Sequence, residues 1–389
     1  MTRMNRRQFL TLSGVSVLAL AGVPGVRRAH AAGRPDRVLV LVELNGGNDG
    51  LNTVVPYRDP AYRRLRPTLA IPPGKIIQLD ERLGLNSAME PLLPLWRQHR
   101  LAIALGVGYP EPNLSHFRSI DIWETGSASD EYLSDGWIAQ LFNKTPLRRD
   151  YDADGVILGR NDAGPLFGGG LGTVALGRAE RALARAARMR GIATETVNPA
   201  LAHVLSVRDR LRHSARAILE KRIDAVDLGV SFPRNDFGRQ METAARLLAA
   251  GVETPVIKVS IGSFDTHANQ AGMHDRLLES LAGGVAAFAR AAEKNGFWER
   301  VLVMTYSEFG RRPAENGSRG TDHGTAAPHF LVGGRVRGGF YGEQPPLNRL
   351  EDGNLGHRLH FRSLYATAAR DWWGLPASFF AEPPLGCIG

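Results

Sequence analysis

Short apolar runs rich in β-branched residues alternate with longer helical stretches along the chain. We predict five strands, at 37–44, 100–108, 254–262, 300–310 and 328–334, and four helices, at 89–99, 115–125, 275–295 and 361–374. The strand segments are continuously apolar, which is typical of a parallel sheet that helices cover on both faces. The pattern therefore predicts the α/β class, as an αβα sandwich with a mainly parallel sheet.

The region between the early and the late strands, about 178–252, is almost wholly helical in character. We interpret it as a helical insertion within one domain that covers 32–389. We find no internal repeat and no low-complexity linker that would divide this domain.

Residues 1–31 have the pattern of a twin-arginine export signal. Arg6 and Arg7 precede an apolar stretch over 12–26, and Ala29-His30-Ala31 supplies a small-x-small cleavage site. The apolar stretch is interrupted by Gly14, Gly22 and Pro24 and is too short for a comfortable membrane span, although a retained N-terminal anchor is the alternative. We therefore expect the twin-arginine machinery as a partner, a periplasmic or otherwise exported location, and no stable membrane span after signal removal.

The signal also explains most of the positive charge. The chain has 48 basic and 39 acidic residues, a net charge of +9. Five of the arginines lie in residues 1–31, which contain no acid, so the remainder carries only +4. This excess is too small to indicate nucleic-acid binding, and the basic stretch 177–191 is expected to be a solvated helix face. The single cysteine, Cys387, has no partner for an internal disulfide.

Functional residues in such sheets gather beyond the carboxyl ends of the strands. Asp49 follows the first strand in "NGGNDG", which lacks both nucleotide-loop glycine patterns, and its alternative role is an Asx turn. Ser115 lies at a helix start, where backbone N–H groups favour an anion, and its alternative role is a simple N-cap.

Later strand ends carry further ligand-type side chains. Asp265 and His267 are two residues apart, so an extended chain points both to one side. The next strand ends with Glu308, and a glycine-flanked loop with adjacent Asp322 and His323 precedes the last strand. Each has a local explanation, such as a helix cap or an ordinary turn. Together, carboxylates and imidazoles at one edge predict a divalent metal site.

Several segments resemble a family of bacterial exported proteins known only as domain of unknown function fifteen-oh-one (DUF1501). They are "NGGNDGLNTVVPY", "LSHFRSIDIWETG", "FDTHANQ", "SEFGRR" and "ENGSRGTDHGTAAPHFLVGG". That family is grouped with the alkaline phosphatase and sulfatase superfamily, whose αβα domain hydrolyses phosphate and sulfate esters with one or two metals. The resemblance implies an alkaline-phosphatase-like fold, with Asp49 as a metal ligand and Ser115 as the nucleophile.

The resemblance allows two alignments at the last ligand pair. Asp322 and His323 match the "DHG" metal pair of the superfamily, but that pair normally follows its strand directly. In the second alignment, which we favour, Glu308 takes the place of the aspartate, Phe309 replaces a histidine, and His323 stands for a later histidine. No formylglycine sulfatase motif is present. The second alignment implies a weakened second metal position.

We therefore expect an exported metal-dependent hydrolase of phosphate or sulfate esters that acts on a small-molecule substrate. Divalent metal, such as zinc, magnesium, calcium or manganese, is predicted to bind the six residues Asp49, Asp265, His267, Glu308, Asp322 and His323, with Ser115 as the catalytic residue. The alternative is a non-catalytic exported binding or surface protein with a degenerate metal site.

Overall fold

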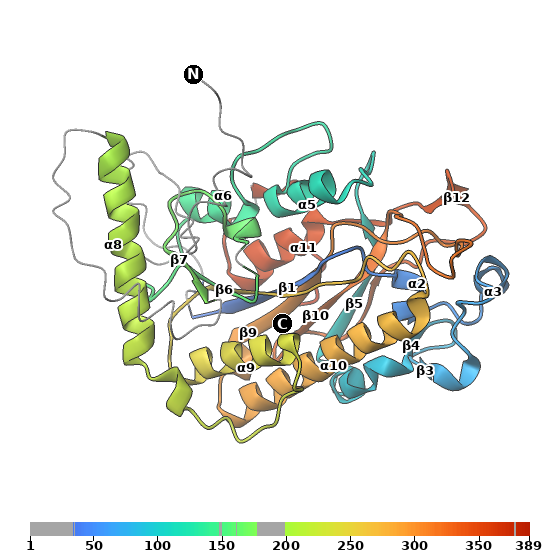
Figure 1. The fold of residues 1–389 in the computed structure, drawn as a ribbon, viewed down its shortest axis with the longest axis horizontal. Coiled ribbons are helices and arrows are strands. Elements are labelled where there is room, and N and C mark those ends of the chain that lie inside the picture. The colour runs from blue at the N-terminus through green and yellow to red at the C-terminus, as the bar shows by residue number, and fades with distance from the viewer. Residues whose placement is uncertain (1–33, 35, 148–149, 161, 177–198, 377–378) are drawn as a thin grey trace.

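The structure, a computed structural model, describes residues 34, 36–147, 150–160, 162–176, 199–376 and 379–389. The predicted export signal, the basic stretch 177–191 and part of the predicted insertion lie outside these residues. The described chain forms a large mixed sheet between two helical layers, with two smaller sheets beside it (Figure 1). This arrangement confirms the predicted α/β class.

The strand order of the main sheet is β11-β5-β10-β9-β1-β8-β6-β7, and β14 also pairs with β5. The bounds are β1 Val38–Leu44, β5 Leu101–Gly108, β6 Gly155–Leu158, β7 Thr173–Leu176, β8 Val256–Ile261, β9 Val301–Tyr306, β10 Ala327–Gly333, β11 Gly339–Gly342 and β14 Leu359–His360. All of the neighbouring strands pair in parallel except β10, which runs antiparallel to both β5 and β9. The amino end of β10 therefore lies at the same edge as the carboxyl ends of β1, β8 and β9.

Each face of the sheet is covered, so the central strands are buried on both sides. Alternate residues of β1 point to opposite faces: Val40 and Val42 pack in one core cluster, and Leu39 and Leu41 in the other. The first cluster lies under α9 (Asp236–Ala249) and α10 (Gln270–Lys294). The second lies under α5 (His116–Thr125), α6 (Trp137–Lys144) and α11 (Arg362–Ala366), which occupy the opposite face in Figure 1.

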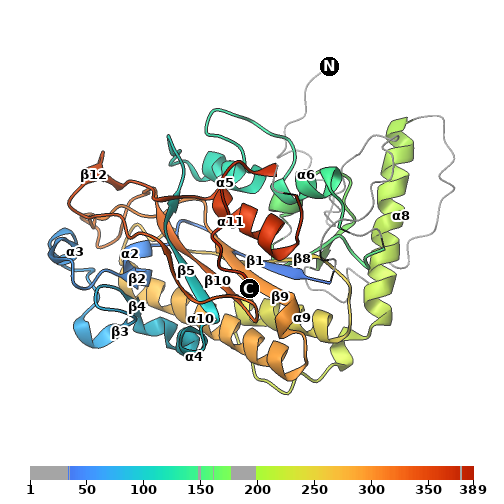
Figure 2. The same cartoon turned by 180° about the vertical axis from the view of Figure 1, so that it is seen from behind.

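Smaller elements complete the fold. The short strands β2 (Val54–Val55), β4 (Gly84–Asn86) and β3 (Ile76–Gln78) form a second sheet, and β12 (Leu350–Glu351) pairs with β13 (Asn354–Leu355). Figure 2, seen from behind, shows this second sheet beside α10 and α8 (Pro199–Glu220) at the opposite end of the molecule. The remaining helices are α2 Gly50–Thr53, α3 Pro60–Leu65, η1 Pro73–Lys75, η3 Gly164–Leu166, η4 Ile223–Ala225 and η5 Trp298–Arg300.

The local predictions differ from the structure where prolines or packing intervene. The stretch predicted as one helix over 89–99 is a 3-10 helix, η2 (Ser87–Leu92), followed by α4 (Leu93–Arg97), because Pro91 and Pro94 lack the amide hydrogens that a continuous helix needs. The closing helix continues from α11 as a π-helical segment, η6 (Thr367–Trp372), and Gly374 follows with a positive φ of 73°. The pattern gave no signal for β6 and β7.

The predicted insertion is only partly described. Within it, α9 packs directly against α10 and β8 and belongs to the layer that covers the sheet. Helix α8 contacts β7 and lies at the end of the sheet. The described part of the predicted insertion therefore contributes to the core of the domain.

Candidate metal centre

The carboxyl edge of the central strands carries a cluster of imidazoles around one carboxylate. His116 begins α5, Asp265 follows β8, and His323 lies in the loop before β10. These three side chains offer ligand atoms that all lie within 4.8 Å of one another. The antiparallel direction of β10 places His323 here, because the loop before that strand reaches the same edge that the other strands leave.

A third histidine approaches the same carboxylate. The Nε2 atom of His267 lies 3.0 Å from Asp265 Oδ1 and 3.0 Å from His323 Nε2. His323 Nε2 is 3.2 Å from Asp265 Oδ1, and His116 Nε2 is 3.4 Å from Asp265 Oδ2. The side chains of Asp265 and His267 therefore meet on one side of the loop after β8, while the intervening Thr266 is buried.

The opposite ring nitrogen of each histidine faces an acceptor. His116 Nδ1 lies 2.8 Å from Glu308 Oε1, and His323 Nδ1 lies 2.8 Å from the carbonyl oxygen of Leu114. His267 Nδ1 is 3.5 Å from Asp322 Oδ1. In a neutral imidazole one nitrogen donates and the other accepts, so a proton on each Nδ1 leaves a lone pair on each Nε2. The three Nε2 lone pairs then converge on the Asp265 carboxylate.

Such an arrangement fits a bound divalent cation. His116 Nε2 is buried and has no hydrogen-bond partner among the described residues. If both rings carry their proton on Nδ1, the Nε2 atoms of His267 and His323, 3.0 Å apart, cannot hydrogen-bond to each other, and a cation bound by both would remove their repulsion. Ligands about 2.0–2.1 Å from zinc are roughly 3.3 Å apart in a tetrahedron, close to the separations seen here. Imidazoles with a carboxylate are a zinc-type donor set.

Arg311 places a positive charge beside the Asp265 carboxylate, which opposes the binding of a cation there. Its side chain is fully buried, and Nη2 donates to Asp265 Oδ1 at 2.6 Å. Its other N–H groups donate to backbone carbonyls, including those of Gly47 at 2.8 Å and Thr321 at 2.9 Å, and Nη1 also lies 3.5 Å from His267 Nε2. Burial disfavours the charged Asp265 carboxylate, but the hydrogen bond and charge of Arg311 outweigh it and lower the Asp265 pKa to about 2. Asp265 Oδ2 stays outside this pairing and faces His116.

The histidine pKa values follow from the same contacts. The hydrogen bond to Glu308 raises the pKa of His116, although partial burial opposes it. Burial lowers the pKa of His323, although the Leu114 carbonyl and Asp265 oppose it. Phe309 is buried against both rings, with centroid distances of 4.8 Å to His116 and 4.5 Å to His323. Phe309, which replaces a histidine in the favoured alignment, therefore provides an apolar contact that orients the rings of His116 and His323.

Glycines allow the loops of the centre to approach one another. A Cβ atom on Gly46, whose φ is 115°, would lie 2.4 Å from the backbone nitrogen of Asp265. A Cβ atom on Gly324 would lie 2.4 Å from the Arg311 carbonyl carbon. The loop around His323 pairs with Arg311 as an isolated antiparallel bridge, and Arg312 donates to the Asp322 carbonyl at 3.0 Å. The loop with adjacent Asp322 and His323 is therefore fixed to the loop after β9.

The structure separates the predicted ligands into three groups. It brings Asp265, His267 and His323 together. Glu308 and Asp322 lie one step further out: Glu308 binds His116 and accepts the Gly46 amide at 2.8 Å, and Asp322 faces His267. Glu308 lies two residues after β9, and His323 precedes β10; the choice between the two alignments stays a prediction.

Asp49 differs from the expectation of a metal ligand. Arg66 donates to both carboxylate oxygens, at 2.6 and 2.9 Å, and Gln270 also donates to one of them. Asp49 is 1% exposed, so no oxygen remains open to a cation. The guanidinium takes the place that we expected a metal to occupy, which corrects the prediction for this residue.

Ser115 lies at the start of α5, where it is the N-cap residue, but its side chain makes no capping hydrogen bond. It is exposed and directly precedes His116. The sequence reasoning missed His116, although the segment "LSHFRS" places it next to Ser115 at a helix start. It also missed Arg311, which the segment "SEFGRR" contains.

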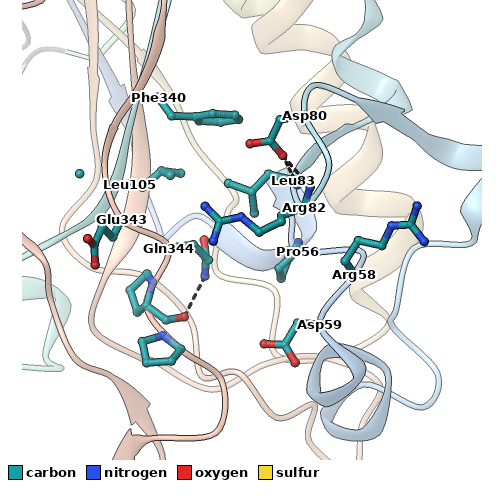
Figure 3. Close-up of a pocket in the computed structure, with 13 residues that line it drawn as sticks. Pro56, Arg58, Asp59, Asp80, Arg82, Leu83, Leu105, Phe340, Glu343 and Gln344 are labelled. Atoms are coloured by element: carbon teal, nitrogen blue, oxygen red, sulfur yellow. Dashed lines mark hydrogen bonds between the residues drawn. The ribbon is translucent and has the colours of Figure 1, made fainter.

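A pocket of about 460 Å³ opens beside the cluster. His116, Asp265 and Glu308 form one side of it, and its other lining residues include Phe117 and Arg160. A larger pocket, of about 590 Å³, lies between β11 and the loops around Arg58 and Arg82 (Figure 3). The larger pocket contains none of the cluster residues, so we associate the chemistry with the smaller one.

A family model of proteins of unknown function, DUF1501, matches residues 91–372. The chain belongs to this family. The matched segment of the DUF1501 protein contains the whole His116–Asp265–His267–His323 cluster and excludes Asp49 and Arg66. A comparison with curated proteins gives no significant match.

Solved structures with a related arrangement include three proteins at low identity. The lipoteichoic acid synthase LtaP from Listeria monocytogenes is 10% identical, with a TM-score of 0.40 over 97% of this chain and 79% of that chain. A protein in the alkaline phosphatase superfamily from Vibrio parahaemolyticus is 10% identical, with a TM-score of 0.40 over 88% and 69%. Phosphonoacetate hydrolase from Sinorhizobium meliloti 1021 is 13% identical, with a TM-score of 0.30 over 76% and 60%. Similarity of this degree leaves the chemistry to be argued from the site.

Within the described residues, no helix combines the length and the apolar character needed to cross a bilayer.

Proposed function

We propose that this protein is an exported metal-dependent hydrolase of phosphate or sulfate esters. The observation that carries the proposal is the convergence of three Nε2 atoms on Asp265, with every Nδ1 facing an acceptor and the buried His116 Nε2 unpartnered. His116, Asp265, His267 and His323 would hold the ion. The resemblance to phosphate and sulfate ester hydrolases supplies the substrate class.

The protein's own side chains prepare the centre before any substrate binds. When bound, a divalent ion polarises an ester oxygen and makes a nearby water more acidic. Glu308 keeps the His116 proton on Nδ1, and the Leu114 carbonyl does the same for His323, so both rings present Nε2. Arg311 holds Asp265 ionised through a 2.6 Å hydrogen bond. The pocket beside His116 and Asp265 provides room for the ester.

The nucleophile is assigned to Ser115 in this proposal, because the serine directly precedes His116 at the start of α5. Since Ser115 makes no capping hydrogen bond, Ser115→Ala should change the free energy of unfolding by less than about 0.5 kcal/mol. Ester turnover should fall by orders of magnitude. Undiminished turnover in Ser115→Ala would assign the attack to water instead.

The proposal is tested by measuring metal content of the purified mature protein together with turnover of aryl phosphate monoesters, aryl phosphate diesters and aryl sulfates. We expect stoichiometric divalent metal and chelator-sensitive hydrolysis of at least one ester class. Metal-free protein that hydrolyses none of them after addition of zinc, magnesium, calcium or manganese would refute it.

A second candidate, a non-catalytic exported binding or surface protein, is favoured by one observation. Arg66 neutralises Asp49, so a second metal position at this carboxylate is filled by protein. This candidate predicts bound metal, or none, without turnover of any ester in the panel.

Export is the remaining part of the proposal and rests on residues 1–31. Replacement of both Arg6 and Arg7 by lysine should keep the chain out of the periplasm in a host that uses the twin-arginine route. Cell fractionation measures this result, and normal export of the double variant would contradict it.

A further inference from the structure

The pocket beside the metal centre extends away from the cluster toward β6. Asp265 follows β8, and Arg160 follows β6, which is the next strand in the sheet. Neighbouring strands are about 4.8 Å apart, so Arg160 can contact a group several ångströms from the one held at the cluster. Both residues line the same pocket.

The Arg160 guanidinium has donors to spare. It is exposed, and one N–H donates to Asn45 Oδ1 at 2.8 Å. None of the described carboxylates forms an ion pair with it. A guanidinium has five N–H donors in a planar fork that matches the oxygens of a carboxylate or phosphate. The free donors on the pocket side are therefore suited to an anionic group.

A buried ion pair holds Asn45, the residue that accepts the hydrogen bond from Arg160. Asn45 Nδ2 donates to Glu43 Oε1 at 3.1 Å, and Glu43 Oε2 lies 3.0 Å from Lys258 Nζ. The side chains of Glu43 and Lys258 are each only 2% exposed. Lys258 also donates to the Asp162 carbonyl at 3.0 Å, which fixes the backbone next to the pocket. Arg160 is thus attached through Asn45 to a rigid part of the sheet.

The pocket lining is mostly polar, and α5 contributes its apolar part. Phe117 and Ile120 of α5 line the pocket, and the Phe117 side chain is 88% exposed. A large apolar side chain with this exposure next to the centre can cover an aryl or other apolar part of a ligand.

We propose that the pocket recognises a second anionic group on the same ester substrate through the Arg160 guanidinium, which Asn45 positions from the buried Glu43–Lys258 pair. The substrate class is then an ester with an apolar body and an additional carboxylate or phosphate. This inference rests on the proposed hydrolase function for the identity of the group at the cluster, and its test uses binding so that the two can fail separately.

The test compares phenylphosphonate with para-carboxyphenylphosphonate as ligands of the metal-loaded protein, by isothermal titration calorimetry. We expect the carboxylated ligand to bind about tenfold more tightly, as a charge-assisted contact provides. Arg160→Met should remove this preference, Arg160→Lys should keep part of it, and Asn45→Ala should reduce it. Arg58→Met is the matched control, because Arg58 is an exposed arginine of the other pocket (Figure 3) and should leave the preference unchanged.

The outcomes separate the claims. Equal affinity of the two ligands for the wild-type protein, no binding of either, or a preference that survives Arg160→Met overturns the assignment of Arg160. A preference lost in Arg58→Met instead places the ligand in the other pocket and also overturns it. An unchanged preference in Asn45→Ala removes only the positioning role. An Arg160-dependent preference without turnover of phenyl phosphate or para-carboxyphenyl phosphate leaves this inference standing and counts against the hydrolase.

Discussion

Two carboxylates in loops that follow central strands, Asp49 after β1 and Asp265 after β8, have opposite environments. Asp49 is 1% exposed, and Arg66 binds both of its oxygens. Asp265 has a side chain that is 43% exposed, and Arg311 binds only one of its oxygens, so Oδ2 remains available on the side of His116. Protein groups bind both oxygens of Asp49, whereas one oxygen of Asp265 can still bind a ligand.

The pKa values alone do not distinguish the two carboxylates. In both, burial opposes ionisation and a neighbouring arginine outweighs it, so both pKa values are lowered. The difference lies in which atoms remain accessible. A perturbed pKa shows that a charge is stabilised, and the unoccupied oxygen and ring nitrogens show where a ligand can bind.

The histidines repeat this contrast. His274 lies in the buried network of Asp49, where its Nε2 is 3.0 Å from Asn48 Oδ1, and burial lowers its pKa. At the metal centre, His116 instead turns Nδ1 to Glu308, and its buried Nε2 has no hydrogen-bond partner among the described residues. The buried Nε2 of His329 in β10 also lacks a partner there, so an unpaired ring nitrogen indicates a ligand site only where other ligand-type side chains lie close to it, as at His116.

The largest expected effect comes from a substitution that breaks the Asp49 network. Arg66→Met leaves a fully buried carboxylate without its counter-charge, which should lower the free energy of unfolding by about 3–5 kcal/mol. Urea denaturation measures the change. Arg64→Met, on the exposed side of the same segment, is the control and should stay within about 0.5 kcal/mol. A small effect of Arg66→Met would mean that Asp49 is not held by this pair.

A second buried network, around Glu124 and Lys258, tests a buried carboxylate whose charge is only partly neutralised. Its effect should appear in the pH dependence of stability. Burial raises the pKa of Glu124 to about 8, although Lys258 opposes the shift. The folded protein then retains a proton that the unfolded chain, with a pKa near 4.5, releases. Stability should therefore fall as pH rises between these two values, with a slope of up to about 1.4 kcal/mol per pH unit.

Glu124→Gln should remove this contribution, because the amide resembles the protonated acid and does not titrate. Urea denaturation at a series of pH values gives the slope. Glu279→Gln on the exposed face of α10 is the control and should retain the wild-type dependence. An identical slope in wild type and Glu124→Gln would show that Glu124 is ionised in the folded protein.

At the metal centre the effect should be on affinity instead of on the fold. His116→Ala or His323→Ala removes one ligand and should weaken divalent-metal binding by about a hundredfold or more. The variants should lose the stabilisation that metal provides and melt like wild type in chelator. His213→Ala, on an exposed position of α8, should change neither property. If wild type binds no metal at micromolar concentration and chelator leaves its melting curve unchanged, the centre is not a metal site.

The smallest effect concerns the residue behind His116. Glu308→Gln removes the negative charge that fixes the His116 proton on Nδ1 and should weaken metal binding by about tenfold. Isothermal titration with zinc measures it. Glu315→Gln, whose carboxylate binds the Thr68 and Leu69 amides, is the control within the following loop. An effect as large as that of His116→Ala would make Glu308 a direct ligand.

Much of the centre was predictable from local patterns. The apolar runs located β1, β5, β8, β9 and β10, and parallel strands end at a common edge, so Asp265 and His267 after β8 could be expected at the same edge as Glu308 after β9. The two-residue spacing of Asp265 and His267 gave their common side. The close backbone approaches at Gly46 and Gly324 became visible only in the structure.

What the sequence by itself determined is therefore the order of the elements, the burial of the strands and the set of ligand-type residues at their ends, because these follow from short-range periodicity. The tertiary structure decided which partner each side chain meets. Asp49 is paired with Arg66 across 17 residues, and His116 with Glu308 across 192. It also decided that β10 is antiparallel, which brings His323 to the cluster. Charge pairing and ring orientation depend on distances of a few ångströms between segments remote in sequence, so only the folded chain fixes whether a carboxylate binds an arginine or remains open to a metal.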